Sequence, residues 1–290
     1  MLTYIKLLLM AIFWGGTFVA GRSLAQTVGP FAAAFFRFAV ASVFLVILLK
    51  RTEGKLTWPA KDQIIPVILL GLTGALVYNY LFLKGLRLIE AGRASVIIAN
   101  NPIFIALFSA YFFKERLTPA KITGILISVA GAVIVISRGR LLDVLQGGLG
   151  PGEIYIFGCV ASWVAFSLIG KAVMDGLSPL QSVTYSSVAG TLLLMVPAFM
   201  ESGLGFMNFS FGDWALIFYL GFFGTVLGFL WYYQGIQKIG PTRAGLFINF
   251  VPISGVLLAF VFLKEPITLS LLIGTLMVSF GVYLTNRPAT

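Results

Sequence analysis

The stretch that decides the fold runs from Gly85 to Gly131 and reads GLRLIEAGRASVIIANNPIFIALFSAYFFKERLTPAKITGILISVAG. The pattern returns 150 positions later, without a gap, as GIQKIGPTRAGLFINFVPISGVLLAFVFLKEPITLSLLIGTLMVSFG. Chance can align leucine with isoleucine, but it does not place the same proline, Lys-Glu pair, threonine and two glycines at the same offsets twice. The recurring residues include Gly85, Pro102, Glu115, Thr118, Gly124 and Gly131, which return as Gly235, Pro252, Glu265, Thr268, Gly274 and Gly281. The sequence therefore predicts two copies of one unit.

The composition is that of a membrane protein. Of 290 residues, 59% are hydrophobic and 10% are charged, whereas soluble domains carry about 25% charged residues. Apolar runs of about 20 residues between short charged or turn-rich segments are typical of membrane-spanning helices. We therefore expect an all-α integral membrane protein with ten spans, at residues 5–24, 30–49, 64–86, 93–113, 120–137, 152–173, 179–200, 212–236, 242–263 and 267–285.

Residue content excludes several kinds of chemistry. The chain has no histidine and one cysteine, Cys159. An internal disulfide is therefore impossible, and a metal site built from histidine or paired cysteines is excluded. A Ser-His-Asp triad is excluded as well. We expect no cofactor and no enzymatic activity.

Positive charge predicts the orientation in the membrane. With the N-terminus in the cytoplasm, twelve Lys and Arg fall on the cytoplasmic side and seven on the other, with Arg37 inside a span. This bias places both termini in the cytoplasm of a multi-pass protein of the bacterial inner membrane. The net charge of +10 then reports orientation, and we expect no nucleic-acid partner.

The first span resembles a secretory leader, but the repeat argues against that interpretation. Trp14, Gly21 and Arg22 match Trp163, Gly170 and Lys171 at an offset of 149, so the segment has a counterpart inside the chain. We divide the chain into a first repeat at 1–140, a linker at 141–151 and a second repeat at 152–290. Five spans is an odd number, so the second repeat must insert upside down, as in many transporters with a binding site between the halves.

The recurring proline, glutamate, threonine and paired glycines resemble the EamA-type unit of the drug/metabolite transporter superfamily, present twice and covering essentially the whole chain. The resemblance implies ten spans, inverted halves and export of small metabolites by alternating access. Within the superfamily, the aromatic-rich interior and the length are similar to the aromatic amino acid exporters of bacterial inner membranes. The expected partners are a small-molecule substrate and the lipid bilayer, and the chain is expected to act as a monomer.

Aromatic and amide side chains are the substrate-binding candidates. Trp14 and Trp163 are equivalent and mid-span; Phe82 and Tyr232 are equivalent, with Tyr78 one turn before Phe82 and Asn79 beside it. Paired aromatics at matching depths would line a cavity suited to a flat apolar side chain. Packing or lipid contact is the alternative for each of them.

Two prolines mark further candidates. Asn100 and Asn101 precede Pro102, and Asn249 precedes Pro252. Proline frees a carbonyl one turn earlier, so these amides either repair a kink or bind the ends of a zwitterion. We expect Pro102, Pro252, Gly85 and Gly235 to act as hinges.

Charged residues inside the spans are scarce. The glutamates fall at span ends or in loops, which argues against cationic drugs and favours a neutral or zwitterionic substrate. We interpret Glu115 and Glu265 as structural groups that bond loops or helix N-termini. Arg37 is either a ligand for a substrate carboxylate or a side chain that snorkels to headgroups or pairs with helix-end carbonyls; we favour the second interpretation.

The predicted function is secondary transport of amino acids, with aromatic amino acids as the first candidates. Export of other metabolites or drugs, and a channel, are the alternatives. An exporter of phosphorylated metabolites would need Lys or Arg at mid-span, where only Arg37 lies. An intramembrane enzyme lacks its usual base and nucleophile or metal.

Overall fold

A computed structural model describes residues 1–54, 59–114, 118–139, 149–173, 177–203, 205–239 and 244–285. These residues form helices and connecting turns and contain no strand. Glu115 and most of the expected linker at 141–151 lie outside the described residues. The all-α membrane fold with two inverted five-helix repeats, predicted from the sequence, is confirmed.

The helices follow the predicted spans closely. In the first repeat they are α1 (Leu2–Thr27), α2 (Pro30–Glu53), α3 (Lys61–Leu70), the π-helix η1 (Gly71–Val77), α4 (Tyr78–Leu88), α5 (Ala91–Ile98), α6 (Asn101–Phe113) and α7 (Pro119–Ile136). In the second they are α9 (Pro151–Val173), α10 (Pro179–Ser202), the short η3 (Gly205–Asn208), α11 (Phe211–Phe218), the π-helix η4 (Tyr219–Leu227), α12 (Gly228–Ile239), η5 (Leu246–Asn249), α14 (Phe250–Leu263) and α15 (Leu269–Thr285). Among the described residues, nine helical stretches are long and apolar enough to cross a membrane, and α15 is a shorter apolar helix of 17 residues.

Local sequence sets where the helices begin. Pro30 and Pro179 occupy the first turns of α2 and α10, where a missing N–H leaves no intrahelical bond unmade. Ser178 Oγ accepts a bond of 3.1 Å from the backbone N–H of Gln181. Ser210 caps α11 in the same way, at 3.1 Å from the N–H of Asp213. These caps satisfy donors that the start of any helix leaves free.

The two halves meet through a self-complementary pair of helices, α7 and α15. Ideal Cβ atoms on Gly124 and Gly281 would lie 2.5 Å from each other's carbonyl oxygen. Gly131 and Gly274 show the same reciprocal approach, at 2.9 and 2.7 Å. Each glycine of one repeat therefore meets the opposite glycine of the other, as a two-fold relation between antiparallel helices requires.

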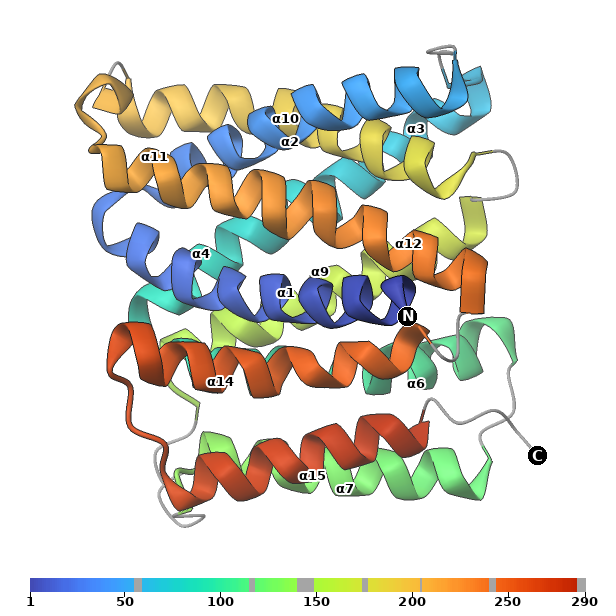
Figure 1. Ribbon diagram of the computed structural model, residues 1–290, viewed down its shortest axis with the longest axis vertical. Coiled ribbons are helices and arrows are strands. Elements are labelled where there is room, and N and C mark those ends of the chain that lie inside the picture. Colours follow the sequence, from blue (N-terminus) through green and yellow to red (C-terminus); the bar gives the residue numbers. More distant parts are fainter. Residues whose placement is uncertain are drawn as a thin grey trace.

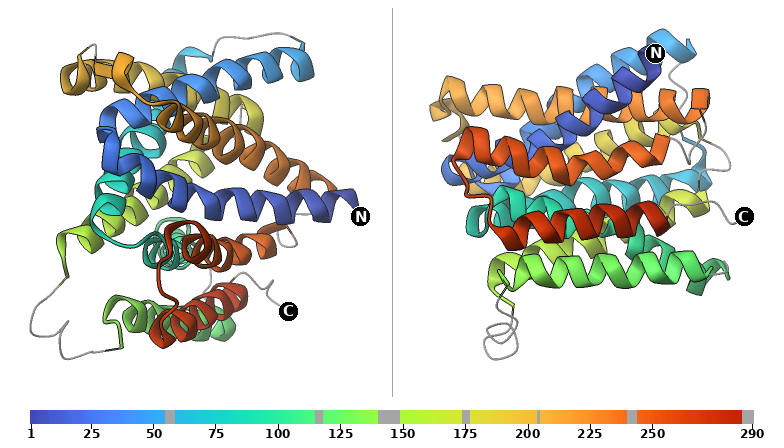
Figure 2. Two further views of the ribbon diagram at one scale, coloured as in Figure 1. Left: turned by 60° about the vertical axis from the view of Figure 1, so that its left-hand side comes forward. Right: turned by 60° about the horizontal axis from the view of Figure 1, so that its bottom comes forward.

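A second contact between equivalent helices of the two repeats lies at the other end of the molecule, where α2 packs on α10. In Figure 1 this pair lies at the top and the α7–α15 pair at the bottom. Between them the repeats interleave: α1 packs on α12 and α14, while α9 packs on α4 and α6. Figure 2 shows the same layers from two other sides. Both repeats even end a helix with the same left-handed residue, Lys114 at φ 54° and Lys264 at φ 57°.

The two prolines break their spans as expected. Helix α5 ends at Ile98 and α6 begins at Asn101, so the break falls beside Pro102. The span that contains Pro252 changes from the 3₁₀ turn η5 to α14 just before that proline. Gly85 and Gly235 lie instead in unbroken helix. Gly85 packs against Ile156 and Gly235 against Leu7. Hinge motion at these positions stays a prediction.

Replacing Gly281 by leucine should destabilise the fold, because the new side chain would meet the backbone of Gly124 and the backbone and Cβ of Ser128. We expect a loss of about 2 kcal/mol or more in the free energy of unfolding, as for other overpacked sites. Thermal unfolding in detergent measures the change. Gly205→Leu is the matched control, because nothing lies within 4 Å of its added Cβ. Equal stability of the two variants would contradict the close helix crossing.

Candidate functional site

A pocket lies between the two repeats, among α2, α3, η1, α4, α9, α10, η4 and α12. Its cavity measures about 50 Å³, which is room for a few water molecules at roughly 10–15 Å³ each. The residues that line it are Arg37, Phe38, Leu70, Gly74, Ala75, Tyr78, Asn79, Trp163, Phe166, Val183, Ser186, Ser187, Thr225 and Phe229. The pocket thus draws on both halves, as an inverted-repeat transporter requires.

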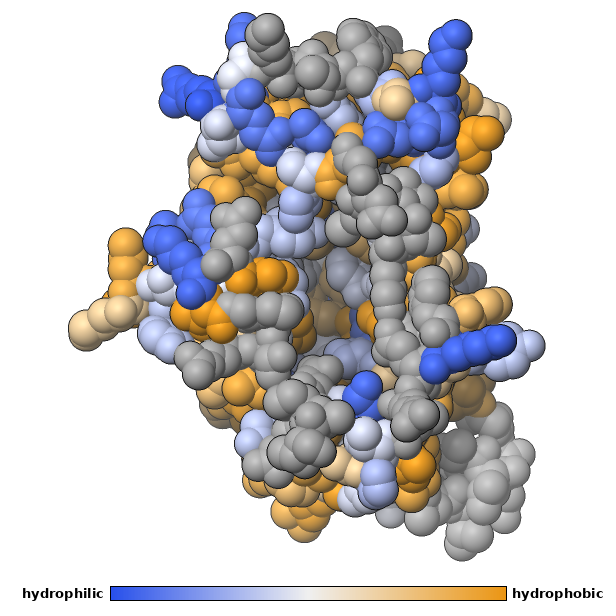
Figure 3. Space-filling model, turned by 90° about the vertical axis from the view of Figure 1, so that its right-hand side faces the viewer, coloured by the Kyte–Doolittle hydropathy of each residue, from blue (hydrophilic) through white to orange (hydrophobic). Residues whose placement is uncertain are grey.

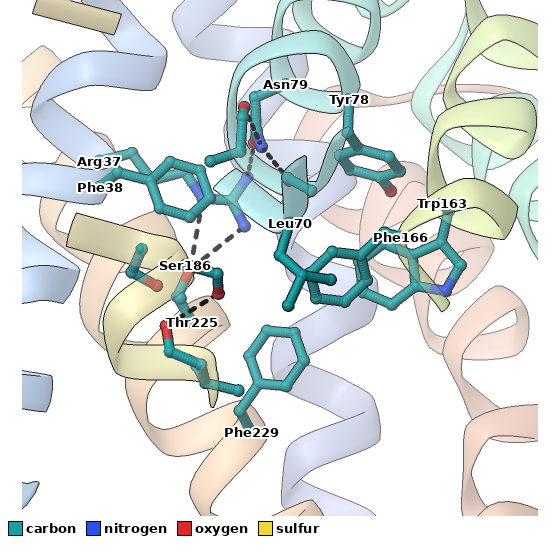
Figure 4. Close-up of a pocket in the computed structure, with 14 residues that line it drawn as sticks. Arg37, Phe38, Leu70, Tyr78, Asn79, Trp163, Phe166, Ser186, Thr225 and Phe229 are labelled. Carbon is teal, nitrogen blue, oxygen red and sulfur yellow. Dashed lines mark hydrogen bonds between the residues drawn. The ribbon is translucent and has the colours of Figure 1, made fainter. Parts of the chain in front are cut away.

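Arg37 lines this pocket, with its guanidinium beside Asn79 and Thr225 (Figure 4). Its Nη1 donates to Asn79 Oδ1 at 2.7 Å, and its Nε and Nη2 donate to Thr225 Oγ1 at 3.4 Å. The guanidinium also lies 5.5 Å from the centre of the Phe38 ring. The interpretation that Arg37 snorkels to headgroups or pairs with helix-end carbonyls is therefore wrong. Polar groups on α4 and η4 hold the side chain inside the protein.

The two π-helices explain why those polar groups are there. A π-helix bonds each N–H to the carbonyl five residues back and leaves a local excess of carbonyl groups. Asn79 Nδ2 donates to the carbonyls of Gly74 and Ala75 at 3.1 and 2.9 Å. Thr225 Oγ1 donates to the carbonyl of Leu220 at 3.1 Å. Each group is thereby oriented with an oxygen toward Arg37.

Other side chains reach the remaining turns of the same π-helices. Trp14 Nε1 donates to the carbonyl of Gly224 in η4 at 2.9 Å. Ser162 Oγ donates to the carbonyl of Thr73 in η1 at 2.7 Å. Trp14 therefore anchors η4 and does not line the pocket.

Together with Phe229, the predicted aromatic residues form one connected chain of rings. Phe82 stacks on Tyr78 at 5.7 Å, Tyr78 contacts Trp163 at 5.4 Å, and Trp163 stacks on Phe229 at 6.4 Å. The chain continues from Phe229 to Trp14 at 5.5 Å and on to Tyr232 at 5.6 Å. Of these rings, Tyr78, Trp163 and Phe229 line the pocket. Phe82 is 2% exposed and packs against Phe18 at 5.3 Å.

The predicted amide residues divide between the pocket and the helix breaks. Asn79 lines the pocket. Asn100 does not; its Nδ2 donates to the carbonyls of Val96 and Ile97, and its Oδ1 accepts from Ser128 Oγ at 2.7 Å. That is the bonding expected of a side chain that repairs a proline break.

Asn101 and Asn249 also lie at the breaks and outside the pocket lining. The Oδ1 atom of each is buried and has no hydrogen-bond partner among the described residues. Binding of substrate by Asn101 or Asn249 stays a prediction, and it would require a substrate path that runs from this pocket to the helix breaks.

Several lining residues were missed from the sequence. They are Phe38, Leu70, Gly74, Ala75, Phe166, Val183, Ser186, Ser187, Thr225 and Phe229, together with Arg37, for which snorkelling was the favoured interpretation. The repeat contained a usable signal for some of them. Phe229 is the equivalent of Asn79 and Thr225 of Ala75 at the 150 offset, while Arg37 and Ser186 each come seven residues after the proline that opens their helix. All six residues of these three equivalent pairs line the pocket.

One face of the molecule is held together by ion pairs. Glu265 accepts from the backbone N–H groups of Ala91 and Gly92 at 2.8 and 3.0 Å. Arg22 Nε pairs with the same carboxylate at 3.1 Å. Arg22 also donates to the carbonyls of Leu86, at 2.9 Å, and Ile89. The structural role predicted for Glu265 is confirmed: it joins the second repeat to the start of α5 in the first.

The same face, which we call the ion-paired face, carries two further ion pairs. Arg93 pairs with Glu153 at 3.0 Å, both largely buried, and it also donates to the carbonyl of Ile136. Arg138 pairs with Glu90 at 3.4 Å.

The N-terminus and the end of α15 lie at the opposite face (Figure 1). That opposite face, the terminal face, is hollowed near its centre (Figure 3).

The EamA-like transporter family matches this chain twice, over residues 1–137 and 150–287. The chain belongs to this family. It is a multi-pass membrane protein that acts as a transporter.

Individual relatives agree with that assignment. The uncharacterized transporter YyaM of Bacillus subtilis is 30% identical over 280 residues, covering 96% of this chain and 92% of its own. A probable terminal-alkyne amino-acid exporter of Streptantibioticus cattleyicolor is 28% identical, covering 97% of this chain and 92% of its own. A protein of known crystal structure matches the fold with a TM-score of 0.65 at 19% identity, covering 98% of this chain and 97% of that one. The relatives are named as transporters, which supports a transporter over an enzyme.

Glu265→Gln should loosen the ion-paired face, because the charge-assisted bonds to the N–H groups of Ala91 and Gly92 are lost. Bonds to charged groups contribute about 1.5–3 kcal/mol, so amides at the start of α5 should exchange with deuterium roughly tenfold faster or more. Hydrogen-exchange mass spectrometry measures this.

Glu201→Gln is the matched control, because Glu201 caps α2 on the same face by accepting from Phe31 and Ala32 at 2.9 and 3.0 Å. Its faster exchange should appear at the start of α2 and not in α5. Identical exchange profiles for the two variants would contradict the specific roles of the two carboxylates.

Proposed function

We propose that this protein exports small amphipathic metabolites, amino acids and aromatic ones first, by alternating access. The observation that carries the proposal is the pocket between the repeats, with polar groups on one side and rings on the other (Figure 4). Tyr78, Trp163 and Phe229 offer faces and edges against which a flat side chain can pack. One relative's name, probable terminal-alkyne amino-acid exporter, supports the amino-acid class.

The difference between the two faces supports alternating access. The ion-paired face joins the halves through Arg22 and Glu265, while the terminal face is hollowed. If the termini are cytoplasmic, as the positive charge predicts, the hollow opens to the cytoplasm and a substrate enters from inside. Export then requires the Arg22–Glu265 pair to separate in the opposite half of the cycle.

The small volume of the cavity supports a transport cycle in which the binding site opens to admit the substrate. A volume of about 50 Å³ is well below the roughly 300–1,000 Å³ of pockets that hold organic ligands. Helices around the pocket must therefore move apart to admit a substrate. The breaks beside Pro102 and Pro252 lie in spans that pack on each other and on α1, and we propose them as the positions where the spans bend.

Purified protein in proteoliposomes tests this proposal. We expect saturable uptake of aromatic amino acids, stimulated by substrate on the opposite side of the membrane. Runs with and without a proton gradient separate coupled from facilitated transport. Flux that rises linearly with concentration and shows no counterflow would indicate a channel, and failure of every amino acid would overturn the proposed substrate class.

Trp163→Ala and Phe229→Ala should weaken transport of aromatic more than aliphatic substrates. Loss of one ring contact costs about 0.5–1.5 kcal/mol beyond buried area, or roughly a 2- to 12-fold loss in apparent affinity. Initial uptake rates across a concentration series measure it. Phe262→Ala is the control, because Phe262 is 68% exposed on α14. Equal losses for aromatic and aliphatic substrates would remove the case for a ring-binding pocket.

A further inference from the structure

Arg37 is the only charged residue among the described residues that line the pocket. An arginine in a protein keeps its charge, and a charge in a membrane interior is costly unless it is paired. In the described part of the chain, Arg37 makes no ion pair within 4 Å. Its partners are a neutral amide, a neutral hydroxyl and the ring of Phe38. A guanidinium in this setting has its charge solvated but not neutralised.

The partners of Arg37 hold it in place and leave it capacity for another acceptor. Asn79 is fixed by its two bonds to η1 and Thr225 by its bond to η4. The two bonds from Arg37 to Thr225 are long, at 3.4 Å, and hydrogen bonds of that length are weak. Guanidinium has five N–H donors in a planar fork that matches a carboxylate. The site is therefore preorganised for an anion with two oxygen atoms.

The pocket departs from the two-fold relation between the repeats, because equivalent positions carry different residues. It is therefore polar on one side only. Ser186, the counterpart of Arg37, also lines the pocket but carries no charge. Phe229 likewise stands where the first repeat has Asn79. Arg37, Asn79 and Thr225 gather on one side of the close-up, with the rings of Tyr78, Trp163 and Phe166 across from them (Figure 4).

We propose that Arg37 binds the carboxylate of the transported substrate, which makes small organic monocarboxylates with an apolar or aromatic group the substrate class. Amino acids fall within this class, but the α-amino group is not required, because no Asp or Glu is among the described lining residues to pair with it. The inference rests on the proposed function in one respect: it takes this pocket as the transport site.

A purely structural role is the alternative to exclude. Arg37 bridges α4 and η4, so its loss could disturb the pocket for every ligand alike. Matched ligands separate the two roles, because a carboxylate anchor affects acids and leaves their uncharged amides unchanged. The pairs are 3-phenylpropionate with 3-phenylpropanamide, and N-acetylphenylalanine with N-acetylphenylalaninamide, so that each amide is uncharged.

The experiment measures binding of these four compounds to detergent-solubilised protein by ligand-induced thermal stabilisation and by quenching of tryptophan fluorescence. Wild-type protein should bind each acid roughly 10- to 100-fold more tightly than its amide, the range expected for hydrogen bonds to a charged group. Arg37→Gln should abolish that preference while amide binding is unchanged, and Arg37→Lys should keep part of it. Thr225→Val removes the two long bonds from Arg37 and the bond from Thr225 to the Leu220 carbonyl. Because Arg37 keeps its charge and its bond to Asn79, this variant should retain the acid preference.

Wild-type protein that binds acid and amide equally well would overturn the inference, as would an Arg37→Gln variant that weakens both members of a pair to the same extent. If Arg37→Gln fails to fold, the wild-type preference and the Arg37→Lys and Thr225→Val variants still decide the matter. Counterflow of the same compounds separates this inference from the proposed function. Transport of aromatic compounds without a preference for acids would contradict the role of Arg37 as a carboxylate anchor and leave the export function standing. Acid-selective binding without transport would contradict the export function and leave the carboxylate anchor standing.

Discussion

The constraint on which the structure depends is that backbone polar groups inside a membrane must find partners within the protein. A π-helical turn makes this harder, because it presents carbonyls that the regular helix would have bonded. Each repeat carries such a turn at the same place, η1 and η4. Asn79, Thr225, Trp14 and Ser162 each donate to a carbonyl of these turns. Two of these groups then present oxygen atoms to Arg37, so the repair of the backbone also builds the polar side of the pocket.

Duplication explains which parts of the molecule could be predicted. The recurrence of Pro102 as Pro252 and of Gly124 as Gly274 was enough to predict two inverted halves and both helix breaks. Apolar run length located the spans within a few residues. The repeat predicts that Trp14 and Trp163 lie at matching depths, but it does not show that Phe229 connects their rings or that only Trp163 of the two lines the pocket.

The pocket itself could not be derived in full. Hydropathy does not distinguish a π-helix from an α-helix, so the displaced carbonyls and their partners were invisible in the sequence. The interpretation of Arg37 was wrong for that reason. Without a known interior acceptor, a buried guanidinium costs more free energy than one that reaches the headgroups. For Asn100 the sequence left break repair and ligand binding open. Its bonds to the carbonyls of Val96 and Ile97, together with the bond from Ser128, are those of a residue that repairs a break.

The crossing of α7 and α15 has a consequence for the origin of the architecture. Gly124 meets Gly281 and Gly131 meets Gly274, so a single five-helix unit carries both surfaces of that contact. Two separate half-length chains inserted in opposite orientations could associate through it as a symmetric dimer. Joining them in one polypeptide removes the requirement that both halves share one sequence. A cation can then occupy one side of the two-fold axis while a serine occupies the other, which no strictly symmetric assembly permits.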